Sequence, residues 1–329
     1  MLESMKIRSV AVLATAALVL TACGGGGKIG DSGSTNAATN KKMVLIPGIQ
    51  AEPFYISMQC GFEEAAKAAG YQVDTQAPAK FDAPQQIPIV TGVLANKPAA
   101  VLIAPTDDKA LAGPMKQLKD AGIKVIEVDT KLQDASIAAS TISSNNEQGG
   151  QLAAQTINKL AAGKSGSVLV LNTKAGTSTT DARAKGFEDE IKKYSNLKYL
   201  GQQYTDNEPA QAASKLTATL AANPDLIGVF ATNLNTGEGA ATGLKSAGKT
   251  GAVNLVGFDA SPKQVQDLQG GVVQALIAQD PATIGKQGVE QAIAAIDGKE
   301  VKRNIETNLV AITKDDAAQN EKYFYKQKC

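Results

Sequence analysis

Two stretches of the chain, "KVIEVDT" (124–130) and "NLVGFDA" (254–260), decide the fold. Each is an apolar, strand-like run that ends on a carboxylate, Asp129 in the first and Asp259 in the second. The preceding residues are also alike, because "KDAG" leads into the first run and "KSAG" leads into the second. This similarity indicates that the chain uses one structural pattern twice.

Strand-like runs alternate with amphipathic helices from Met43 onward. Continuous apolar strands separated by helices are typical of a parallel sheet covered on both faces. The predicted strands are 43–47, 99–104, 124–129, 167–172, 197–204, 225–231, 254–259 and 272–279. "CGFEEA" (60–65) and "KGFEDE" (185–190) occupy matching predicted helices. The prediction is therefore an α/β protein of two similar lobes, the second beginning near residues 144–145.

The repeated aspartates point to a site between the lobes. In open parallel sheets, ligands bind beyond the carboxyl ends of the strands, and Asp129 and Asp259 end equivalent predicted strands. If the two rims face each other, both carboxylates line one cleft. The alternative is that each aspartate caps a following helix, and "ASPKQVQDL" (260–268) allows such a helix after Asp259. We favour the cleft.

The N-terminal segment is predicted to be a targeting signal rather than part of the fold. Lys6 and Arg8 precede an apolar run at 10–20, which is too short for a transmembrane helix. Cys23 follows Leu-Thr-Ala and resembles the cysteine of a bacterial lipobox. We predict a lipoprotein signal peptide at 1–22 and a lipid-anchored flexible tether at 23–41, because the Gly-, Ser- and Asn-rich stretch has little apolar mass to bury. An ordinary signal peptide with a chance cysteine is the alternative.

The composition of the 329-residue chain excludes several classes of function. The chain has no histidine, which rules out His-based catalytic triads and His metal sites. Without Lys6, Arg8 and Glu3 of the signal, 31 basic residues face 31 acidic ones, and no basic block suggests nucleic acid. No cofactor or metal site is expected. Cys60 and Cys329 either form a disulfide that ties the C-terminal tail to the first helix or remain separate thiols.

Eight motifs, in order, resemble the type I periplasmic substrate-binding proteins of ABC sugar importers, ribose-binding class. They are "EPFYISMQCGFEEAAKAAG", "LIAPTDDKAL", "VIEVDT", "SSNNEQGG", "AGTSTTDARAKGF", "FATN", "VGFDASP" and "ALIAQDPATIG". The resemblance runs from about Met43 to Lys314 and implies two Rossmann-like lobes joined by a three-crossing hinge. It implies an N-terminal lobe of 42–144 and 280–307 and a C-terminal lobe of 145–279 and 308–329. The crossings are expected near Ser144, after Gln279 and near Asn308.

The resemblance also implies a set of ligand contacts. Phe54 and Tyr55 match the aromatic pair that sandwiches the sugar ring in the family, and flat aromatic faces suit the C–H face of a sugar. A hydrophobic staple at the helix start is the alternative role for one of these rings. Asp129 and Asp259 match the carboxylates that bind sugar hydroxyls. The further matching contacts are Glu52, Asn233 and Gln279.

The chain departs from the family's ribose binder at several of these contacts. Thr130 stands where the ribose binder has an arginine, and Asp181 replaces another arginine, although Arg183 lies two residues further on. Asn207 replaces an aromatic contact. The carboxylates expected at the site are Glu52, Asp129, Asp181 and Asp259. With guanidinium exchanged for acid, we expect a neutral or amine-bearing sugar or polyol, and we disfavour uronates and sugar phosphates.

One motif suggests a different function and is rejected. "GLKSAGKT" (243–250) matches the phosphate-binding pattern G-x-x-x-x-G-K-[ST]. That motif requires a strand before the loop and a helix after it. Here a predicted helix (about 236–246) precedes the loop and a strand follows it, so we expect Gly248 to end a helix.

We therefore expect a lipid-anchored binding protein on the extracytoplasmic face of the cell membrane. It would be a monomer that captures a sugar or polyol and delivers it to ABC permease subunits, with Cys23 embedded in membrane lipid. Two alternatives share the fold: a ligand-sensing subunit for a membrane receptor, and an intracellular regulator, although the latter would need a helix-turn-helix where the signal lies. An enzyme is the least favoured class.

Overall fold

The computed structural model describes residues 41–329. The predicted signal peptide, Cys23 and all of the tether but its last residue lie outside the described residues. Within residues 41–329, no helix is long and apolar enough to cross a membrane.

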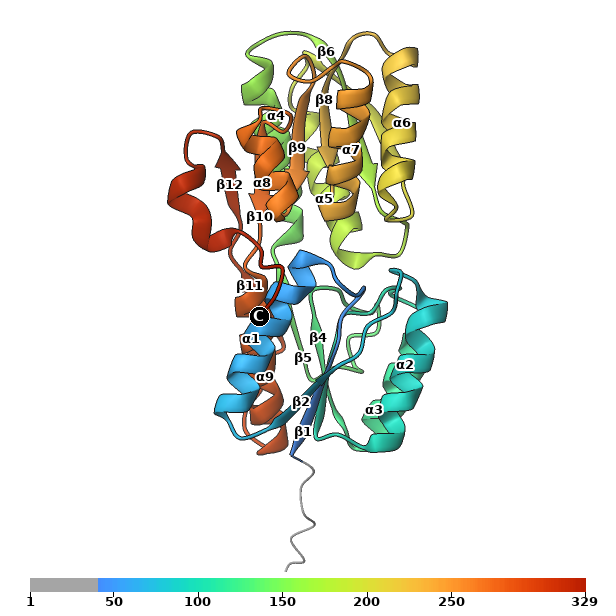
Figure 1. Cartoon of the computed structure of the whole chain (residues 1–329). Coiled ribbons are helices and arrows are strands. Elements are labelled where there is room, and N and C mark those ends of the chain that lie inside the picture. The colour runs from blue at the N-terminus through green and yellow to red at the C-terminus, as the bar shows by residue number, and fades with distance from the viewer. Residues whose placement is uncertain (1–40) are drawn as a thin grey trace, which may run out of the picture. The chain divides into compact units, whose positions relative to one another are not determined.

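The first lobe is built on a fully parallel sheet of order β11-β5-β4-β3-β1-β2 (Figure 1). Its strands are β1 (Lys42–Ile46), β2 (Gln72–Thr75), β3 (Ala100–Ile103), β4 (Lys124–Val128), β5 (Ser140–Ser144) and β11 (Asn304–Thr307). Its helices are α1 (Pro53–Ala68), α2 (Ala83–Asn96), α3 (Ala112–Asp120) and α9 (Pro281–Ile296). In β1, Met43 and Leu45 pack in the core beneath α1 and α9, whereas Val44 and Ile46 pack beneath α2 and α3. Both faces are covered, which explains the continuous apolar strands.

The second lobe has the same plan, with the strand order β12-β10-β9-β8-β6-β7. Its strands are β6 (Gly166–Asn172), β7 (Leu197–Tyr204), β8 (Leu226–Ala231), β9 (Asn254–Phe258), β10 (Ala275–Ala278) and β12 (Val310–Thr313), and only the β10–β12 pair among them is antiparallel. Its helices are α4 (Asn146–Ala161), α5 (Ser178–Ile191), α6 (Pro209–Ala222), α7 (Leu234–Ser246) and α8 (Pro262–Gln269), followed by the 3₁₀ helix η1 (Ala317–Tyr323). The predicted fold class is confirmed. The strands that were not predicted are the short or polar ones, β2, β5, β11 and β12.

Three crossings connect the lobes within residues 41–313, between β5 and α4, between β10 and α9, and between β11 and β12. The hydroxyl of Ser144, at the first crossing, contacts one residue at each of the other two crossings. Ser144 Oγ donates to Gln279 Oε1 at 2.8 Å and lies 3.3 Å from Thr307 Oγ1. All three side chains are buried, so the crossings form one hydrogen-bonded unit.

The repeated Gly-Phe pair has the same packing role in each lobe. A Cβ at Gly61 of α1 would lie 2.0 Å from the Ala282 carbonyl oxygen of α9, and a Cβ at Gly186 of α5 would lie 2.0 Å from the Glu147 carbonyl oxygen of α4. The following phenylalanines, Phe62 and Phe187, are completely buried. The glycine therefore lets two helices approach closely while the phenylalanine fills the core below them.

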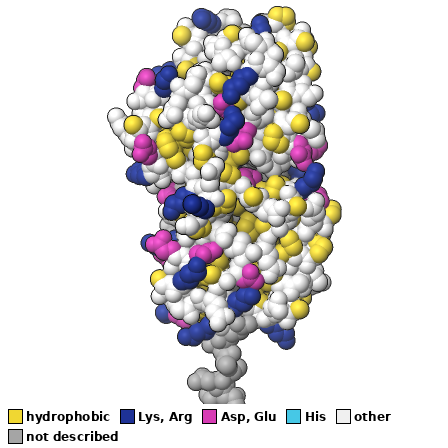
Figure 2. All heavy atoms as spheres, in the orientation of Figure 1, with side chains coloured by type: hydrophobic (Ala, Val, Ile, Leu, Met, Phe, Trp, Pro, Cys, Tyr) yellow, Lys and Arg dark blue, Asp and Glu magenta, His cyan; other side chains and the backbone are white. Residues whose placement is uncertain are grey.

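The rejected phosphate-binding pattern lies on a helix end, as predicted. The helix α7 ends at Ser246, Gly248 has a φ of +61°, and β9 follows. On the face shown in Figure 2, basic and acidic side chains are interspersed over both lobes.

Candidate functional site

Asp129 and Asp259 have equivalent backbone positions at the ends of β4 and β9. Both adopt a left-handed conformation, with φ of +63° and +82°, which is uncommon for residues other than glycine. The Asp129 N–H donates to the Ile142 carbonyl of the neighbouring strand, and the Asp259 N–H donates to the Ile277 carbonyl. This turn at each strand end directs both carboxylates into one cavity between the lobes.

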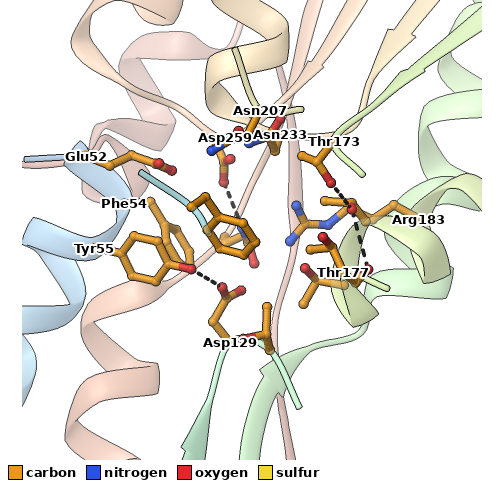
Figure 3. A pocket seen from close by; sticks show the side chains of 15 residues that line it. Glu52, Phe54, Tyr55, Asp129, Thr173, Thr177, Arg183, Asn207, Asn233 and Asp259 are labelled. Carbon is orange, nitrogen blue, oxygen red and sulfur yellow. Dashed lines mark hydrogen bonds between the residues drawn. The ribbon is translucent and has the colours of Figure 1, made fainter. Parts of the chain in front are cut away.

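The cavity is lined by residues of both lobes (Figure 3). Ten of the predicted contacts line it: Glu52, Phe54, Tyr55, Asp129, Thr130, Arg183, Asn207, Asn233, Asp259 and Gln279. Further lining residues were not predicted: Phe81, Thr173, Thr177, Thr179 and Thr180. The threonines lie in or just before the quoted stretch "AGTSTTDARAKGF", where a cluster of hydroxyls before a helix was the available signal. Phe81 lies in the loop before α2, and no sequence pattern indicated its position.

The lobes contact each other around this cavity. The Lys131 N–H donates to Ser178 Oγ at 2.9 Å, and the Asp108 N–H donates to the Gly176 carbonyl at 3.1 Å. Lys80 forms an ion pair with Glu208 at 3.0 Å. The structure is therefore a closed form, in which both rims surround the cavity.

Asp259 is held by donors from three separate segments. Its Oδ1 accepts from Gln279 Nε2 at 2.7 Å and from the Tyr325 hydroxyl at 2.8 Å, and its Oδ2 accepts from the Leu234 N–H at 2.9 Å. Leu234 is the first residue of α7, where the helix dipole favours a negative charge. Burial raises the pKa of Asp259, whereas Arg183 and these donors favour its charged form.

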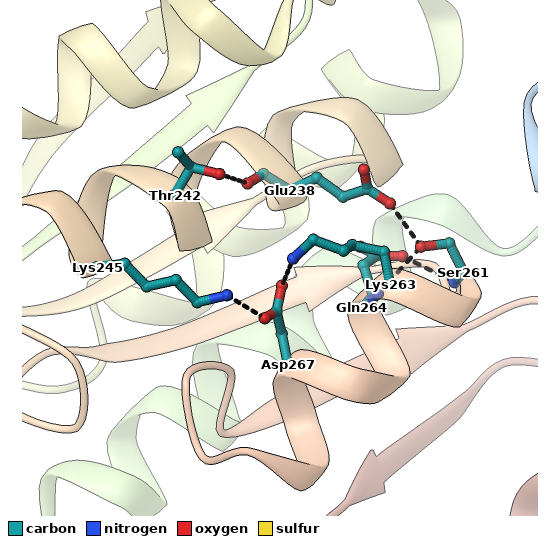
Figure 4. Close-up of polar contacts among 7 residues, drawn as sticks. All are labelled: Glu238, Thr242, Lys245, Ser261, Lys263, Gln264 and Asp267. Atoms are coloured by element: carbon teal, nitrogen blue, oxygen red, sulfur yellow. Dashed lines mark hydrogen bonds and ion pairs between the residues drawn. The ribbon is translucent and has the colours of Figure 1, made fainter.

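The alternative in which Asp259 caps the following helix is wrong. Ser261 caps α8 instead, through a capping box with Gln264 (Figure 4). Ser261 Oγ also donates to Glu238 Oε1 of α7, and Asp267 of α8 is paired with Lys245 of α7. These contacts hold α8 against α7 and leave the Asp259 carboxylate directed into the cavity.

Asp129 has fewer protein partners. Its Oδ2 accepts from the Tyr55 hydroxyl at 2.8 Å, and Figure 3 shows the two side chains pointing toward each other. Burial raises the pKa of Asp129 to about 6, although Arg183 and the Tyr55 hydroxyl oppose this rise. No protein donor contacts its Oδ1 within hydrogen-bonding distance in the described structure, so this carboxylate has acceptor capacity left for a ligand.

Arg183, one of the predicted contacts, lies in the cavity wall, so the site keeps a guanidinium although Thr130 and Asp181 replace two arginines of the ribose binder. Its Nε donates to Asn146 Oδ1 and its Nη1 to the Thr232 carbonyl, both at 2.8 Å. The guanidinium carbon lies 3.7 Å from the centre of the Phe258 ring. Its Nη2 is buried without a protein partner, as is Thr177 Oγ1. Buried polar groups without partners are costly, so both atoms are suited to bonds with a bound molecule.

Asp181 lies outside the cavity, so the expectation that it adds a carboxylate to the site is wrong. Its carboxylate accepts from the Gly176 N–H at 2.9 Å and from Asn172 Nδ2 at 3.3 Å. It lies in the first turn of α5, and its side chain accepts a hydrogen bond from the loop before that helix. Arg183, two residues further along α5, reaches the cavity instead.

Phe54 and Tyr55 do not enclose a sugar ring between them, which corrects the predicted sandwich. Their ring centres are 5.1 Å apart with an interplanar angle of 77°. Rings on opposite faces of a sugar would be about 7–8 Å apart, or about twice a carbon–carbon contact distance. The two rings therefore form one edge-to-face wall of the cavity. Phe81 offers a second aromatic surface, and a Cβ on Gly48 would collide with both Phe81 and Tyr55.

The remaining predicted contacts surround these groups. Glu52 Oε2 accepts from Asn235 across the cleft at 3.3 Å; burial, together with Asp259 and other carboxylates, raises the pKa of Glu52 well above its usual range. Asn233 caps α7 and donates to Asn207 Oδ1 at 2.7 Å. Thr130 Oγ1 donates to the Pro105 carbonyl at 2.8 Å.

Cys60 and Cys329 form a disulfide in the structure, which joins α1 to the end of the chain. Of the two readings left open by the sequence, the structure contains the bonded one.

Comparison with known proteins agrees with this architecture. Residues 43–300 match the family described as the periplasmic binding protein domain. The chain belongs to the periplasmic binding protein family. The ribose import binding protein RbsB of Escherichia coli strain K12 is 32% identical over 285 residues, which cover 85% of this chain and 93% of RbsB.

Solved structures of similar proteins contain bound sugars. An ABC transporter solute-binding protein from Agrobacterium vitis, bound with α-D-tagatopyranose, is 40% identical with a TM-score of 0.84, covering 87% of this chain and 99% of that one. A second protein from A. vitis, with bound D-fucose, is 27% identical with a TM-score of 0.82, covering 86% of this chain and 100% of that one. The chain shares its fold and its family with these sugar-binding transport proteins.

Proposed function

We propose that this chain binds a neutral or amine-bearing sugar or polyol in the cavity between its lobes and delivers it to the membrane subunits of an ABC importer. The observation that carries the proposal is the combination of free acceptors and free donors around the cavity. Asp129 offers acceptor capacity, whereas Arg183 Nη2 and Thr177 Oγ1 are buried and unpartnered. A sugar hydroxyl donates to one such group and accepts from the other at the same time.

The charges favour a neutral or amine-bearing sugar. Arg183 places one guanidinium beside Asp129, Asp259 and Glu52, so the carboxylates still outnumber the cations that line the cavity. A uronate or a sugar phosphate would add negative charge to this buried set, which is costly. Several matched relatives are named as import binding proteins, and we therefore favour delivery for transport over sensing.

The predicted signal peptide and tether support an anchored location. Lipidation of Cys23 would hold a monomeric binding protein at the extracytoplasmic face of the membrane, close to its permease. Ligand closure would bring the lobes into the arrangement seen here, because a sugar that touches both rims binds the closed form better than the open form.

A thermal-shift screen followed by titration calorimetry tests the proposal. The panel is D-tagatose, D-fucose, D-allose, D-ribose, D-arabinose and D-glucosamine, with D-galacturonate and D-ribose 5-phosphate as anionic counterparts. We expect at least one neutral or amine-bearing sugar to raise the melting temperature, and no shift with the anions. Tight binding of either anion would contradict the assignment of ligand charge, and a panel without any shift would contradict the assignment of function.

A further inference from the structure

The C-terminal residues 314–329 leave the second lobe and end on the first. They follow β12, pass through η1 and finish beside α1, where Figure 1 marks the C-terminus. The Tyr325 N–H donates to the Ala260 carbonyl of the second lobe at 3.0 Å. The next residue, Lys326, donates its N–H to Ser57 Oγ of α1 at 2.7 Å. The chain therefore changes lobes between two consecutive residues.

The end of this segment is fixed covalently to the first lobe. Cys329 is bonded to Cys60, which lies on α1 one residue before the close contact of Gly61 with α9. Between Tyr325 and Cys329, the chain can extend by at most about 14 Å. The disulfide consequently limits how far α1 can move from Ala260 when the lobes separate. This is a fourth connection, separate from the three crossings.

The same segment reaches the sugar-binding carboxylate. The buried Tyr325 hydroxyl donates to Asp259 Oδ1 at 2.8 Å and accepts from the Gln279 N–H at 3.1 Å. Its ring lies 5.7 Å from the ring of Phe54 on the cavity wall. Gln279 in turn bonds Asp259 and the crossing residue Ser144. Tyr325 therefore links the chain end, the hinge and the site through direct contacts.

We propose that residues 314–329 form a strap that restricts lobe opening through the Cys60–Cys329 disulfide and holds Asp259 in its binding orientation through Tyr325. The assignment of Asp259 as a sugar contact rests on the proposed function, whereas the restriction on opening does not. Tyr325 is a positioning residue, because it lies behind the carboxylate and does not line the cavity. A strap that excludes widely open conformers raises the fraction of binding-competent protein, and with it the apparent affinity.

Hydrogen exchange in the ligand-free protein tests the restriction on opening. The amides of Asp108 and Lys131 donate across the cleft and report on closure. With Cys329→Ser, we expect peptides that contain these amides to exchange faster than in the parent, and saturating D-tagatose to remove the difference. Equal exchange in the ligand-free parent and variant would overturn the strap. Because this arm needs no sugar, it remains informative if no sugar binds.

Calorimetry with D-tagatose over a pH series tests the positioning role. Tyr325→Phe deletes the hydroxyl that donates to Asp259. We expect about tenfold weaker binding at pH 7, because the charged form of Asp259 loses a donor. For the same reason, we expect the loss of affinity on acidification to begin at a higher pH than in the parent. We expect about threefold weaker binding with Cys329→Ser and an unchanged pH profile. Tyr323→Phe, on the same segment, is the matched control and should behave as the parent. An unchanged pH profile in Tyr325→Phe would reduce its role to packing.

Discussion

Asp129 and Asp259 end the corresponding strands of two lobes built on the same plan, yet they have different surroundings. Both have a positive φ, both N–H groups bond the neighbouring strand, and each carboxylate accepts from a tyrosine hydroxyl at 2.8 Å. The tyrosines, however, come from unrelated places: Tyr55 lies on α1, and Tyr325 lies in the C-terminal strap. Asp259 alone gains two further donors, Gln279 and the Leu234 N–H.

The difference shows what a repeated fold can supply and what it cannot. The repeated strand and turn bring both carboxylates to one cavity. The strap has no counterpart in the other lobe, and its Tyr325, together with Gln279 and the Leu234 N–H, restrains Asp259 more firmly than Tyr55 restrains Asp129. We infer that Asp259 is a fixed acceptor, whereas Asp129 retains acceptor capacity for a ligand and has a pKa that burial raises to about 6.

Asp259→Asn should have the largest effect. An amide can accept at only one position, so its NH₂ group would face at least one of the donors that now bond the carboxylate, and a buried donor would lose its partner. We expect at least about 100-fold weaker binding of D-tagatose or the best sugar in the panel. The melting temperature of the ligand-free protein should fall by about 5 °C.

Titration calorimetry and differential scanning calorimetry measure these two effects. Parent-like affinity in Asp259→Asn would show that the carboxylate does not contact the sugar.

Asp129→Asn should have a smaller effect. Among the described residues, the Tyr55 hydroxyl is the one hydrogen-bond donor to its carboxylate, and that hydroxyl can rotate to suit an amide. We expect binding about 20-fold weaker, since a charge-assisted bond is replaced by a neutral one. The melting temperature without sugar should stay within about 2 °C of the parent. If Asp129→Asn destabilised the fold as much as Asp259→Asn, the contrast between the two carboxylates would be lost.

Acid pH should produce the smallest effect, and it should act mainly through Asp129. Its raised pKa means that the charged form needed by a donating hydroxyl is present above about pH 6 and lost as the pH falls through that value. We expect affinity about tenfold weaker at pH 5 than at pH 7. The effect of pH on folding stability has the opposite sign. Because the pKa of Asp129 is raised in the folded state, its protonation stabilises the fold at acid pH, and this stabilisation is lost as the pH rises through about 6.

Calorimetry at both pH values, in buffers with different ionisation enthalpies, measures the affinity and the protons released on binding. The groups facing Asp129 that bear on this result are Tyr55, Glu52, Asp259 and Arg183. In Asp129→Asn the dependence between pH 5 and 7 should disappear. If it persisted, Glu52 or Asp259 would be the titrating group.

The local pattern of the chain was enough to predict the two lobes and the positions of both carboxylates. An apolar run that ends on an aspartate defines a strand and its carboxyl end, and parallel strands bring such ends to one rim. The family resemblance then predicted most of the residues that line the cavity, because these residues belong to strands and helices that the pattern had already located. The prediction that Asp181 lines the cavity was wrong for a local reason. Asp181 and Arg183 lie two residues apart on α5, so their side chains leave the helix in different directions, and that of Asp181 points away from the cavity.

The tertiary structure alone decided how the site is held. Arg183 enters the cavity because α5 packs closely on α4 and its guanidinium lies over Phe258, 75 positions away in the chain. Tyr325 reaches Asp259 across a sequence separation of 66, from a strap whose end is bonded to Cys60. Sequence periodicity records which residues share a face within one element. It carries no record of which distant segments pack together, because that depends on the summed burial and hydrogen bonding of the whole domain.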